Sequence, residues 1–266
     1  MPEEPTPVLL EVADGVATIT FNRPAAMNSL DVATKVSLLA AVRQVADDPA
    51  VRCVVLTGTG RAFCVGQDLK EHVEILTSGA TDSLFRTVDE HYNPIVSTLV
   101  EMQKPVIAAV NGVAAGAGAS LAFACDLRIV ADTAGFNLAF ANIALSCDTG
   151  SSFTLQRLVG RARAIELLYF PRTVPADEAL ALGLATQVVP AGELTDVVTR
   201  LAGRLAAGPT VALGAMRQSL TFAADHTFAE SVENESAQMT RTGRTADHAA
   251  AVEAFLAKQQ PVFGGR

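Results

Sequence analysis

The sequence predicts an α/β protein whose mixed layers end near residue 200 and are followed by a helical region. Half of the residues are hydrophobic and 18% are charged, which is typical of a compact domain with a substantial core. Short apolar runs alternate with segments of helical periodicity, as in α/β folds. After Pro190 the periodicity is helical throughout, in residues 194–207, 211–222, 228–240 and 245–258. We therefore expect a core over residues 1–200 and a helical region over 201–266.

The first half of the chain predicts a hairpin, a helix and a buried strand. Residues 8–21 alternate apolar and polar side chains around Asp14-Gly15, a pair typical of hairpin turns. Asp31 can cap the helix that follows it, because its side-chain oxygen can accept one of the first free N–H groups. The apolar run 51–56 is typical of a strand covered on both faces. A polar loop and then a helix are expected downstream, over 77–83 and 83–102.

The second half predicts further alternation around one central helix. Short strands are expected at 105–110, 127–131, 135–138 and 186–189. Helices are expected at 119–125, 162–169 and 175–182, and Val159-Gly160 marks a helix end or turn.

The stretch Asn111–Asp126 is the centre of this pattern. It places Gly112, Gly116 and Gly118 between a strand and a helix, where glycine opens unusual backbone dihedrals and lets a ligand approach closely. The first N–H groups of the helix have no intrahelical partner and carry partial positive charge. An electron-rich oxygen would be stabilised there.

Other interpretations of this stretch stay open. Residues 106–125 are uncharged, long enough to span a bilayer and contain GxxxG, but they are mostly alanine and glycine without an aromatic belt. Gly116-Ala-Gly118 is half of a dinucleotide-binding motif. Residues 118–122 nearly match the serine-hydrolase elbow, with Ser120 as nucleophile. The fourth interpretation is a buried helix whose small residues only allow close packing.

Charge and composition argue against several classes. The formal net charge is −8 and basic residues do not cluster, so neither nucleic acid nor an anionic membrane is an expected partner. The four cysteines lack CxxC spacing and the four histidines lack metal-ligand spacing. The N-terminal residues have no signal-peptide pattern. We expect a cytoplasmic enzyme without a metal or a separate cofactor.

Four motifs occur in a characteristic order: ITFNRPAAMNSLD (19–31), GTGRAFCVGQDLK (58–70), KPVIAAVNGVAAGAGASLAFACDLRI (104–129) and FLAKQQPVF (255–263). Together they resemble the crotonase superfamily, the enoyl-CoA hydratase/isomerase family, over nearly the whole chain. Within it, GQDL, HYNP at 91–94 and VAAGAGA are similar to the phenylacetyl-CoA ring-epoxide isomerase branch.

The resemblance implies a ClpP-like spiral of ββα units, with C-terminal helices that build homotrimers or dimers of trimers. It also implies an acyl-CoA thioester as ligand, whose oxygen two backbone N–H groups would hold. By alignment these belong to Gln67, after Gly66, and to Ala117, after Gly116; such donors stabilise an enolate oxygen. Further contacts to the acyl-CoA are implied for Ala62, Asp68, Leu69 and Lys70. Contacts to its phosphates are implied for Arg23 and for Lys258, the latter from the same or from a neighbouring subunit.

The sequence departs from the hydratases of this family at two positions. Those enzymes use two glutamates, one to activate water and one to deliver a proton. The glutamates align with Ser120 and Phe140, neither of which can replace a carboxylate. Ordinary hydration is therefore not expected, and these two residues are expected to contact the substrate instead.

Asp148, in ALSCDTGSS (144–152), is the remaining acid/base candidate. The resemblance places a carboxylate here beside the acyl group, and an isomerisation needs one base that takes and returns a proton. Apolar neighbours Phe140 and Leu145 would raise its pKa. Alternatively, Asp148 only caps the next helix. The Asp-Thr-Gly triplet also matches aspartic proteases, which need a second triplet that this sequence lacks.

The family's 4-chlorobenzoyl-CoA dehalogenase is a rival, because it carries a nucleophilic Asp at the position of Asp148. Its histidine base aligns with Asn93, whereas His91 lies two residues earlier and about 200° around the helix. His72, beside the GQDLK motif, is interpreted as a solvated helix residue.

The sequence thus predicts an enzyme that isomerises an unsaturated or ring-derived acyl-CoA. The alternatives are a hydratase with non-standard acid/base groups, an acyl-CoA binding protein without activity, and a serine hydrolase.

Overall fold

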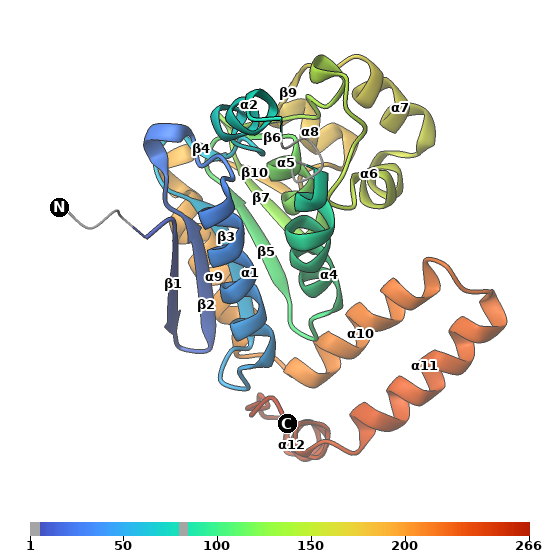
Figure 1. Cartoon of the computed structure of the whole chain (residues 1–266). Helices are drawn as coiled ribbons and strands as arrows, with labels where there is room; N and C mark the ends of the chain where they lie inside the picture. Colours follow the sequence, from blue (N-terminus) through green and yellow to red (C-terminus); the bar gives the residue numbers. More distant parts are fainter. Residues whose placement is uncertain (1–5, 80–84) are drawn as a thin grey trace.

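The computed structural model describes residues 6–79 and 85–266 and contains two β-sheets surrounded by helices (Figure 1). The predicted hairpin is confirmed: β1 (Val8–Ala13) and β2 (Val16–Phe21) pair antiparallel, with Ala13 opposite Val16. Asp14 and Gly15 have φ values of 50° and 77°, as a type I′ turn requires.

The larger sheet has six strands in the order β1-β2-β3-β5-β7-β10, and all except β1 run parallel. Its central strands are almost entirely buried, which explains their continuous apolar sequences. The four strands that follow the hairpin are β3 (Cys53–Gly58), β5 (Val106–Val110), β7 (Leu127–Ala131) and β10 (Gln187–Val189).

The smaller sheet has the order β4-β6-β8-β9, and only β8 lies within a predicted strand. Its strands have three residues each, too few for a period-two pattern to show in the sequence. The chain repeatedly passes from the larger sheet to the smaller one and then into a helix, so the expected ββα spiral is confirmed. The strands are β4 (Ala62–Cys64), β6 (Val113–Ala115), β8 (Gly135–Asn137) and β9 (Thr173–Pro175).

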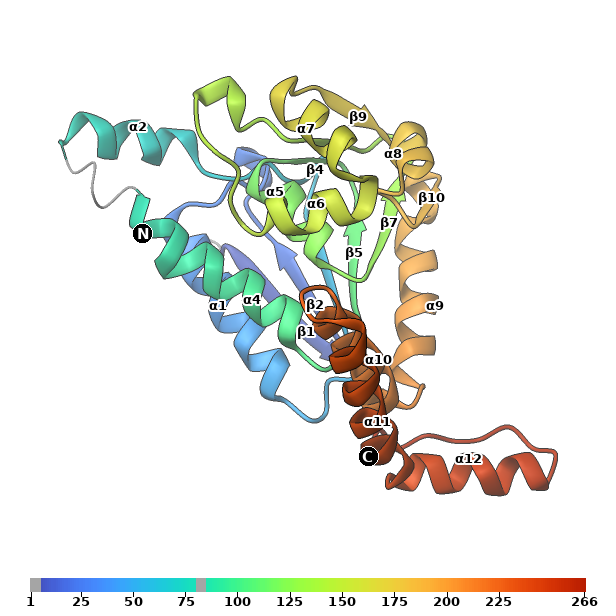
Figure 2. The same ribbon diagram turned by 90° about the vertical axis from the view of Figure 1, so that its right-hand side faces the viewer.

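Helices cover both faces of the larger sheet (Figure 2). On one face lie α1 (Val32–Asp47) and α4 (Asn93–Glu101); on the other lies α9 (Leu194–Ala206). The predicted cap of α1 is present, since Asp31 Oδ1 accepts a hydrogen bond from the N–H of Thr34 at 2.8 Å. The larger sheet is therefore buried between two helical layers.

The helix expected over 83–102 contains a π turn. Residues 80–84, which also carry most of the expected loop 77–83, lie outside the described part of the chain. From residue 85 the backbone is helical, widens into the π turn η2 (Val88–Tyr92) and continues as α4. Such turns are frequent at functional sites, and this one carries the buried Tyr92.

The central helix α5 (Ala117–Ala124) begins two residues earlier than predicted, and all of its residues are buried. The uncharged stretch 106–125 is divided among β5, β6 and α5. Within residues 6–79 and 85–266, no helix combines the length and apolarity needed to cross a membrane. The membrane-span interpretation is therefore wrong, and α5 is a buried helix of the core.

The remaining core helices are short. Asp68 caps α2, because its carboxylate accepts hydrogen bonds from the N–H groups of Lys70 and Glu71. The α-helices are α2 (Leu69–Thr77), α6 (Ser151–Val159), α7 (Arg161–Tyr169) and α8 (Ala176–Leu182). The 3₁₀ turns are η1 (Pro24–Ala26), η3 (Ala141–Ile143) and η4 (Ala191–Glu193).

The last three helices extend away from the core (Figure 1). They are α10 (Thr210–Ala223), α11 (Phe228–Gly243) and α12 (Ala246–Leu256). The boundary expected at residue 200 falls inside α9, which packs on the strands of the larger sheet. We propose that the division between core and helical region lies after Ala206.

Candidate active site

One cavity of about 480 Å³ brings several of the predicted site residues together. Its wall contains the loop between β4 and α2, the start of α5 and the segment from residue 139 to Asp148. The predicted residues that line it are Gln67, Leu69, Gly116, Ala117, Phe140 and Asp148. Segments far apart in the sequence thus meet around one space.

In the described part of the chain, two backbone N–H groups at this cavity, those of Gln67 and Ala117, are free to bind a ligand oxygen. The carbonyl of Gly66 accepts from Leu30 N at 2.7 Å, and that of Gly116 accepts from Ser120 N at 3.1 Å. In a trans peptide the N–H points opposite to the carbonyl, so those of Gln67 and Ala117 point the other way. Neither N–H has an acceptor among the described residues. Both residues line the cavity, as an oxyanion-binding pair would.

The three glycines of the central stretch have different roles. A Cβ at Gly112 would lie 2.1 Å from Arg61 O, and one at Gly118 would lie 2.1 Å from Cys64 O. These two glycines therefore allow close packing onto the β4 region. Gly116 has φ 50° and ψ −125° as the residue before α5, and no atom lies within 4 Å of a Cβ built there. Only Gly116 fits the expected approach of a ligand.

Among the described residues that line the cavity, Asp148 is the one with an acidic side chain. Burial raises its pKa above the ordinary value, although a hydrogen bond from the Thr149 hydroxyl (2.9 Å) and the charge of Lys35 act in the opposite direction. The helix-cap alternative is wrong: α6 is preceded by Gly150 and has no side-chain cap. A carboxylate with a raised pKa in an apolar pocket is suited to proton transfer.

The rest of the wall is mainly apolar. Phe140 is 8% exposed and precedes η3, and Ile143 and Leu145 lie beside it on the cavity. An apolar wall around one carboxylate disfavours the charged form of that carboxylate.

Ser120 does not lie on the cavity wall. It is fully buried in α5, where its hydroxyl donates to Gly116 O at 3.0 Å and shares a short hydrogen bond with Ser151. A nucleophilic serine needs an adjacent base and an open approach. The structure therefore gives no support to the serine-hydrolase interpretation, and it places Ser120 behind the Gly116 backbone.

The other residues expected to contact the coenzyme are mostly engaged elsewhere. Arg23 pairs with Asp31 and Asp68, each at 2.9 Å, and also donates to Ser29. Ala62 is buried, and its carbonyl accepts from the side chains of Asn28 and Asn111. Lys70 is exposed at the start of α2.

Lys258 is not near the cavity. It follows α12, which lies at the end of the molecule opposite α5 (Figure 1). Within one chain the structure does not bring Lys258 to the cavity, so a contact with the coenzyme would require a second copy.

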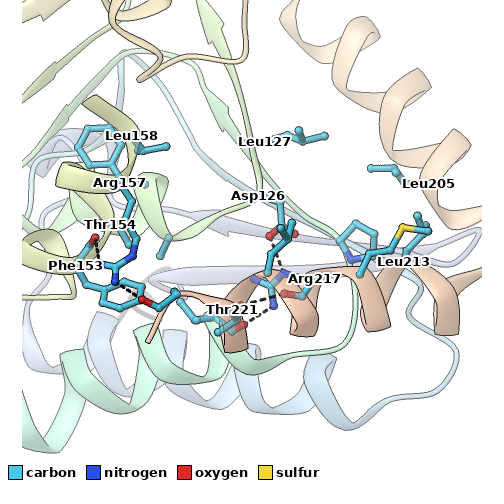
Figure 3. Close-up of a pocket in the computed structure, with 17 residues that line it drawn as sticks. Asp126, Leu127, Phe153, Thr154, Arg157, Leu158, Leu205, Leu213, Arg217 and Thr221 are labelled. Carbon is cyan, nitrogen blue, oxygen red and sulfur yellow. Dashed lines mark hydrogen bonds and ion pairs between the residues drawn. The ribbon is translucent and has the colours of Figure 1, made fainter. Parts of the chain in front are cut away.

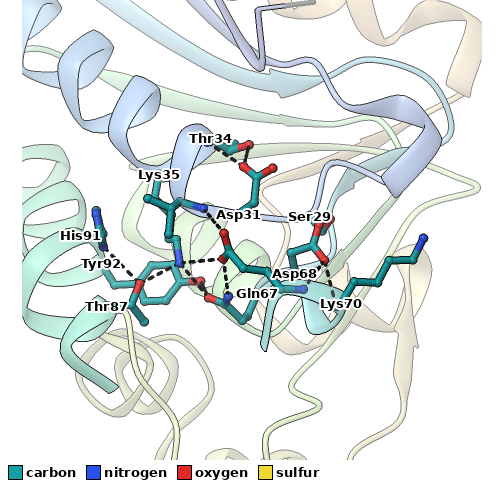
Figure 4. A network of polar contacts seen from close by, with 12 residues as sticks. Ser29, Asp31, Thr34, Lys35, Gln67, Asp68, Lys70, Thr87, His91 and Tyr92 are labelled. Atoms are coloured by element: carbon teal, nitrogen blue, oxygen red, sulfur yellow. Dashed lines mark hydrogen bonds and ion pairs between the residues drawn. The ribbon is translucent and has the colours of Figure 1, made fainter. Parts of the chain in front are cut away.

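A buried polar network beside the cavity was not predicted (Figure 4). Lys35 and Tyr92, each 1% exposed, both donate to Gln67 Oε1, at 3.1 and 2.6 Å. Burial lowers the pKa of Lys35 and raises that of Tyr92. The sequence did contain a signal for the burial of Lys35, because Lys35 shares a helical face with Leu38 and Val42, which are buried.

The histidines do not complete a dehalogenase site. His91 Nδ1 lies 3.2 Å from Thr87 Oγ1 and lines a separate pocket of about 290 Å³. Burial lowers the pKa of His91. Asn93 donates to Asp89 at 3.1 Å. None of these side chains lines the cavity of Asp148.

A second and larger cavity, about 670 Å³, lies between α10 and the core (Figure 3). Its charged groups are engaged. Arg217 donates to Asp126 and to the carbonyls of Leu99, Val100 and Met102. Arg157 donates to the carbonyls of Phe153 and Ala224. This cavity is therefore an apolar groove without an available acid or base. Within the described ranges no cluster of three potential metal ligands occurs.

Across the described residues, repeated ββα units, with one free N–H group before α2 and another at the start of the buried helix α5, define a crotonase fold. The family model for enoyl-CoA hydratase/isomerase matches residues 11–266. The chain belongs to the enoyl-CoA hydratase/isomerase family.

Similar proteins cover nearly the whole chain. The Escherichia coli protein 1,2-epoxyphenylacetyl-CoA isomerase is 40% identical over 97% of this chain and 98% of its own. A Rhodobacter capsulatus protein described as an enoyl-CoA hydratase is 38% identical over 96% and 97%. A crystal structure from Mycobacterium abscessus, described as an enoyl-CoA hydratase/isomerase, is 43% identical with a TM-score of 0.94, covering 97% of this chain and 100% of that one.

Proposed function

We propose that this protein isomerises an unsaturated or ring-derived acyl-CoA by moving a proton between carbons of the bound acyl group. The observation that carries the proposal is the shared cavity of Asp148 and the two N–H donors, those of Gln67 and Ala117. The similarity to 1,2-epoxyphenylacetyl-CoA isomerase supports the same class of substrate.

The proposed reaction uses two kinds of group. The thioester oxygen binds between the two N–H groups, so that the negative charge of an enolate is stabilised as it forms. The Asp148 carboxylate removes a proton from one carbon and returns it to another. Burial raises the pKa of Asp148, which favours the protonated carboxyl group between these two steps.

Hydration is the competing proposal, and the side chains disfavour it. Hydration needs one group to activate water and another to protonate the α-carbon. We propose that Ser120 and Phe140 replace the two hydratase glutamates. Ser120 is enclosed by Gly116 and Ser151, and Phe140 offers only an aromatic ring. One carboxylate in the cavity matches an isomerase better than a hydratase.

Product mass separates these reactions directly. The protein is incubated with a β,γ-enoyl-CoA, an α,β-enoyl-CoA and a saturated acyl-CoA, and products are identified by chromatography with mass detection. We expect the β,γ-enoyl-CoA to be converted to an isomer of unchanged mass. A product heavier by one water would favour hydration, and binding without any turnover would favour a non-catalytic acyl-CoA protein.

We also propose that the chain forms a homotrimer or a dimer of trimers through α10–α12. These helices carry strongly exposed apolar side chains, including Leu220 (77%), Phe228 (85%) and Phe255 (81%). Exposed apolar surface of this extent is typical of association sites. Leu220 also lines the apolar groove beside α10.

A further inference from the structure

The side chain of Gln67 is held at both ends. Its carbonyl oxygen accepts from Lys35 Nζ at 3.1 Å and from Tyr92 OH at 2.6 Å, and its Nε2 lies 3.4 Å from Glu71 Oε2 (Figure 4). The acidic partner Glu71 is itself fixed, because it accepts a hydrogen bond from Val32 N at 3.0 Å. Both polar atoms of this side chain therefore have protein partners.

Lys35 is an unusual member of this network, because a buried charge is costly unless it is well paired. Its Nζ donates to Thr87 Oγ1 at 2.7 Å as well as to Gln67, and lies 3.8 Å from Glu71 Oε2. It also lies 5.5 Å from the centre of the Tyr92 ring. Lys35 thus joins α1 to Gln67, Glu71 and Thr87 through polar contacts that packing of the core alone does not require.

The network acts on the backbone that carries the proposed oxyanion donor. On one side, Leu30 holds this segment by accepting from Asp68 N (3.1 Å) and donating to Gly66 O. On the other side, the side chain of Gln67 is held by α1 and η2. The segment is therefore held through its backbone by Leu30 and through the Gln67 side chain by α1 and η2.

We propose that Lys35 and Tyr92 are positioning residues for the oxyanion donor: they hold the Gln67 side chain so that its backbone N–H points at the thioester oxygen. This inference rests on the proposed function of the cavity. Neither residue lines that cavity, so neither contacts the reacting atoms.

The test is the carbonyl stretching frequency of a bound saturated acyl-CoA labelled with carbon-13 at the thioester carbonyl. Hydrogen bonds to the oxygen lower this frequency without any turnover. In the unmodified protein we expect a clear downshift relative to the same compound in water. In Lys35→Met and in Tyr92→Phe we expect at least half of that downshift to be lost.

Kinetics give a second readout. Removal of a whole oxyanion donor lowers kcat by about 100-fold to 1,000-fold, so misdirection of one donor is expected to lower kcat by roughly tenfold. KM is expected to change by less than about threefold, because the rest of the coenzyme still binds. A role in stability alone would leave both the frequency and kcat of the folded variant unchanged.

Lys104→Met is the matched control. Lys104 is a second buried lysine, 8% exposed, whose Nζ donates to the carbonyls of Val45 and Asp48, each at 2.6 Å. Its removal is expected to lower stability without changing the carbonyl frequency. If Lys35→Met does not fold, Tyr92→Phe, which removes one oxygen atom, decides the question.

The outcomes separate the two proposals. No downshift in the unmodified protein would overturn the oxyanion site itself. A downshift that survives in full in folded Lys35→Met or Tyr92→Phe would overturn the positioning role and leave the oxyanion site standing.

Discussion

The backbone of Gly66 lies against the backbone nitrogen of Ala117. A Cβ built at Gly66 would lie 3.1 Å from Ala117 N and 2.9 Å from Ala115 O. Two loops separated by about fifty residues in the sequence therefore approach more closely than side chains permit, and this contact sets the spacing of the two proposed oxyanion donors.

Gly66→Ala is expected to damage the site more than the fold. The added methyl group meets backbone atoms, and φ of 82° at this position disfavours alanine. We expect kcat on the best acyl-CoA substrate to fall by about 100-fold, as for loss of an oxyanion donor. Steady-state kinetics check this, with Gly203→Ala as control: nothing lies within 4 Å of its Cβ, and α9 should accept alanine without loss. Equal activity of Gly66→Ala and the unmodified protein would contradict the proposed site.

Asp148→Asn is expected to remove activity, because an amide cannot accept and return the proton. In the unmodified protein, kcat/KM should decline on the acid side with an apparent pKa above the ordinary aspartate value of about 3.9. Measurement of kcat/KM from pH 4 to 8 checks both points. Asp132→Asn, an exposed aspartate outside the cavity that accepts from Ala191 N, is the control and should keep full activity. Undiminished turnover in Asp148→Asn would remove this residue from the mechanism.

Asp148→Asn is also expected to stabilise the fold near neutral pH. Burial raises the pKa of Asp148, so the folded protein binds this proton more tightly than the unfolded chain does. The ionised carboxylate therefore destabilises the folded state above the raised pKa, and this effect disappears as pH falls below about 3.9. Melting temperatures should show Asp148→Asn above the unmodified protein at pH 7, with a difference that shrinks toward pH 4. A lower melting temperature of Asp148→Asn than of the unmodified protein at pH 7 would mean that the ionised carboxylate does not destabilise the folded state.

Arg23→Met is expected to lower the free energy of unfolding by about 1–3 kcal/mol, because Arg23 joins the two aspartates that cap α1 and α2. Burial alone would raise the pKa of Asp68, but hydrogen bonds from Ser29, Arg23 and backbone N–H groups outweigh it and lower the pKa. The stability that this carboxylate contributes is present above about pH 3.9 and is lost as pH falls through the lowered pKa. The variant should therefore unfold at a higher pH during acid titration.

Urea unfolding at pH 7 and acid titration measure these effects of Arg23→Met. Arg172→Met is the control, since Arg172 pairs with Glu178 on the surface and its loss should change stability little. Unchanged stability of Arg23→Met would contradict the structural role. A selective loss of affinity for coenzyme A over its 3′-dephospho form would show that Arg23 also binds a phosphate.

Leu220→Glu is expected to weaken self-association, because it places a charge on the exposed apolar face of α10. Light scattering after size exclusion should give three or six times the chain mass of 27.7 kDa for the unmodified protein and a smaller assembly for the variant. Leu180→Glu, an apolar-to-acid change on α8, is the control and should not change the mass. A monomeric unmodified protein would contradict the proposed assembly.

The sequence predicted most of the fold because most elements carry a local signal. The apolar run of β3, the cap at Asp31 and the helical periodicity after Pro190 were all read from neighbouring residues, and each agrees with the structure within a few positions. The strands β4, β6 and β9 were missed because three residues cannot show a period. Their pairing is decided by contacts between distant parts of the chain.

For the site, the family resemblance and the local glycine pattern indicated which segments matter, and Gln67, Ala117, Phe140 and Asp148 do meet at one cavity. The sequence did not predict the orientation of the polar side chains. Only the packed structure turns Ser120 inward against Ser151, commits Arg23 to two aspartates and places Lys35 and Tyr92 on Gln67. Composition and periodicity act along the chain and determine which elements form. The orientation of a polar side chain depends instead on which distant donor or acceptor the packing of those elements brings within hydrogen-bonding distance.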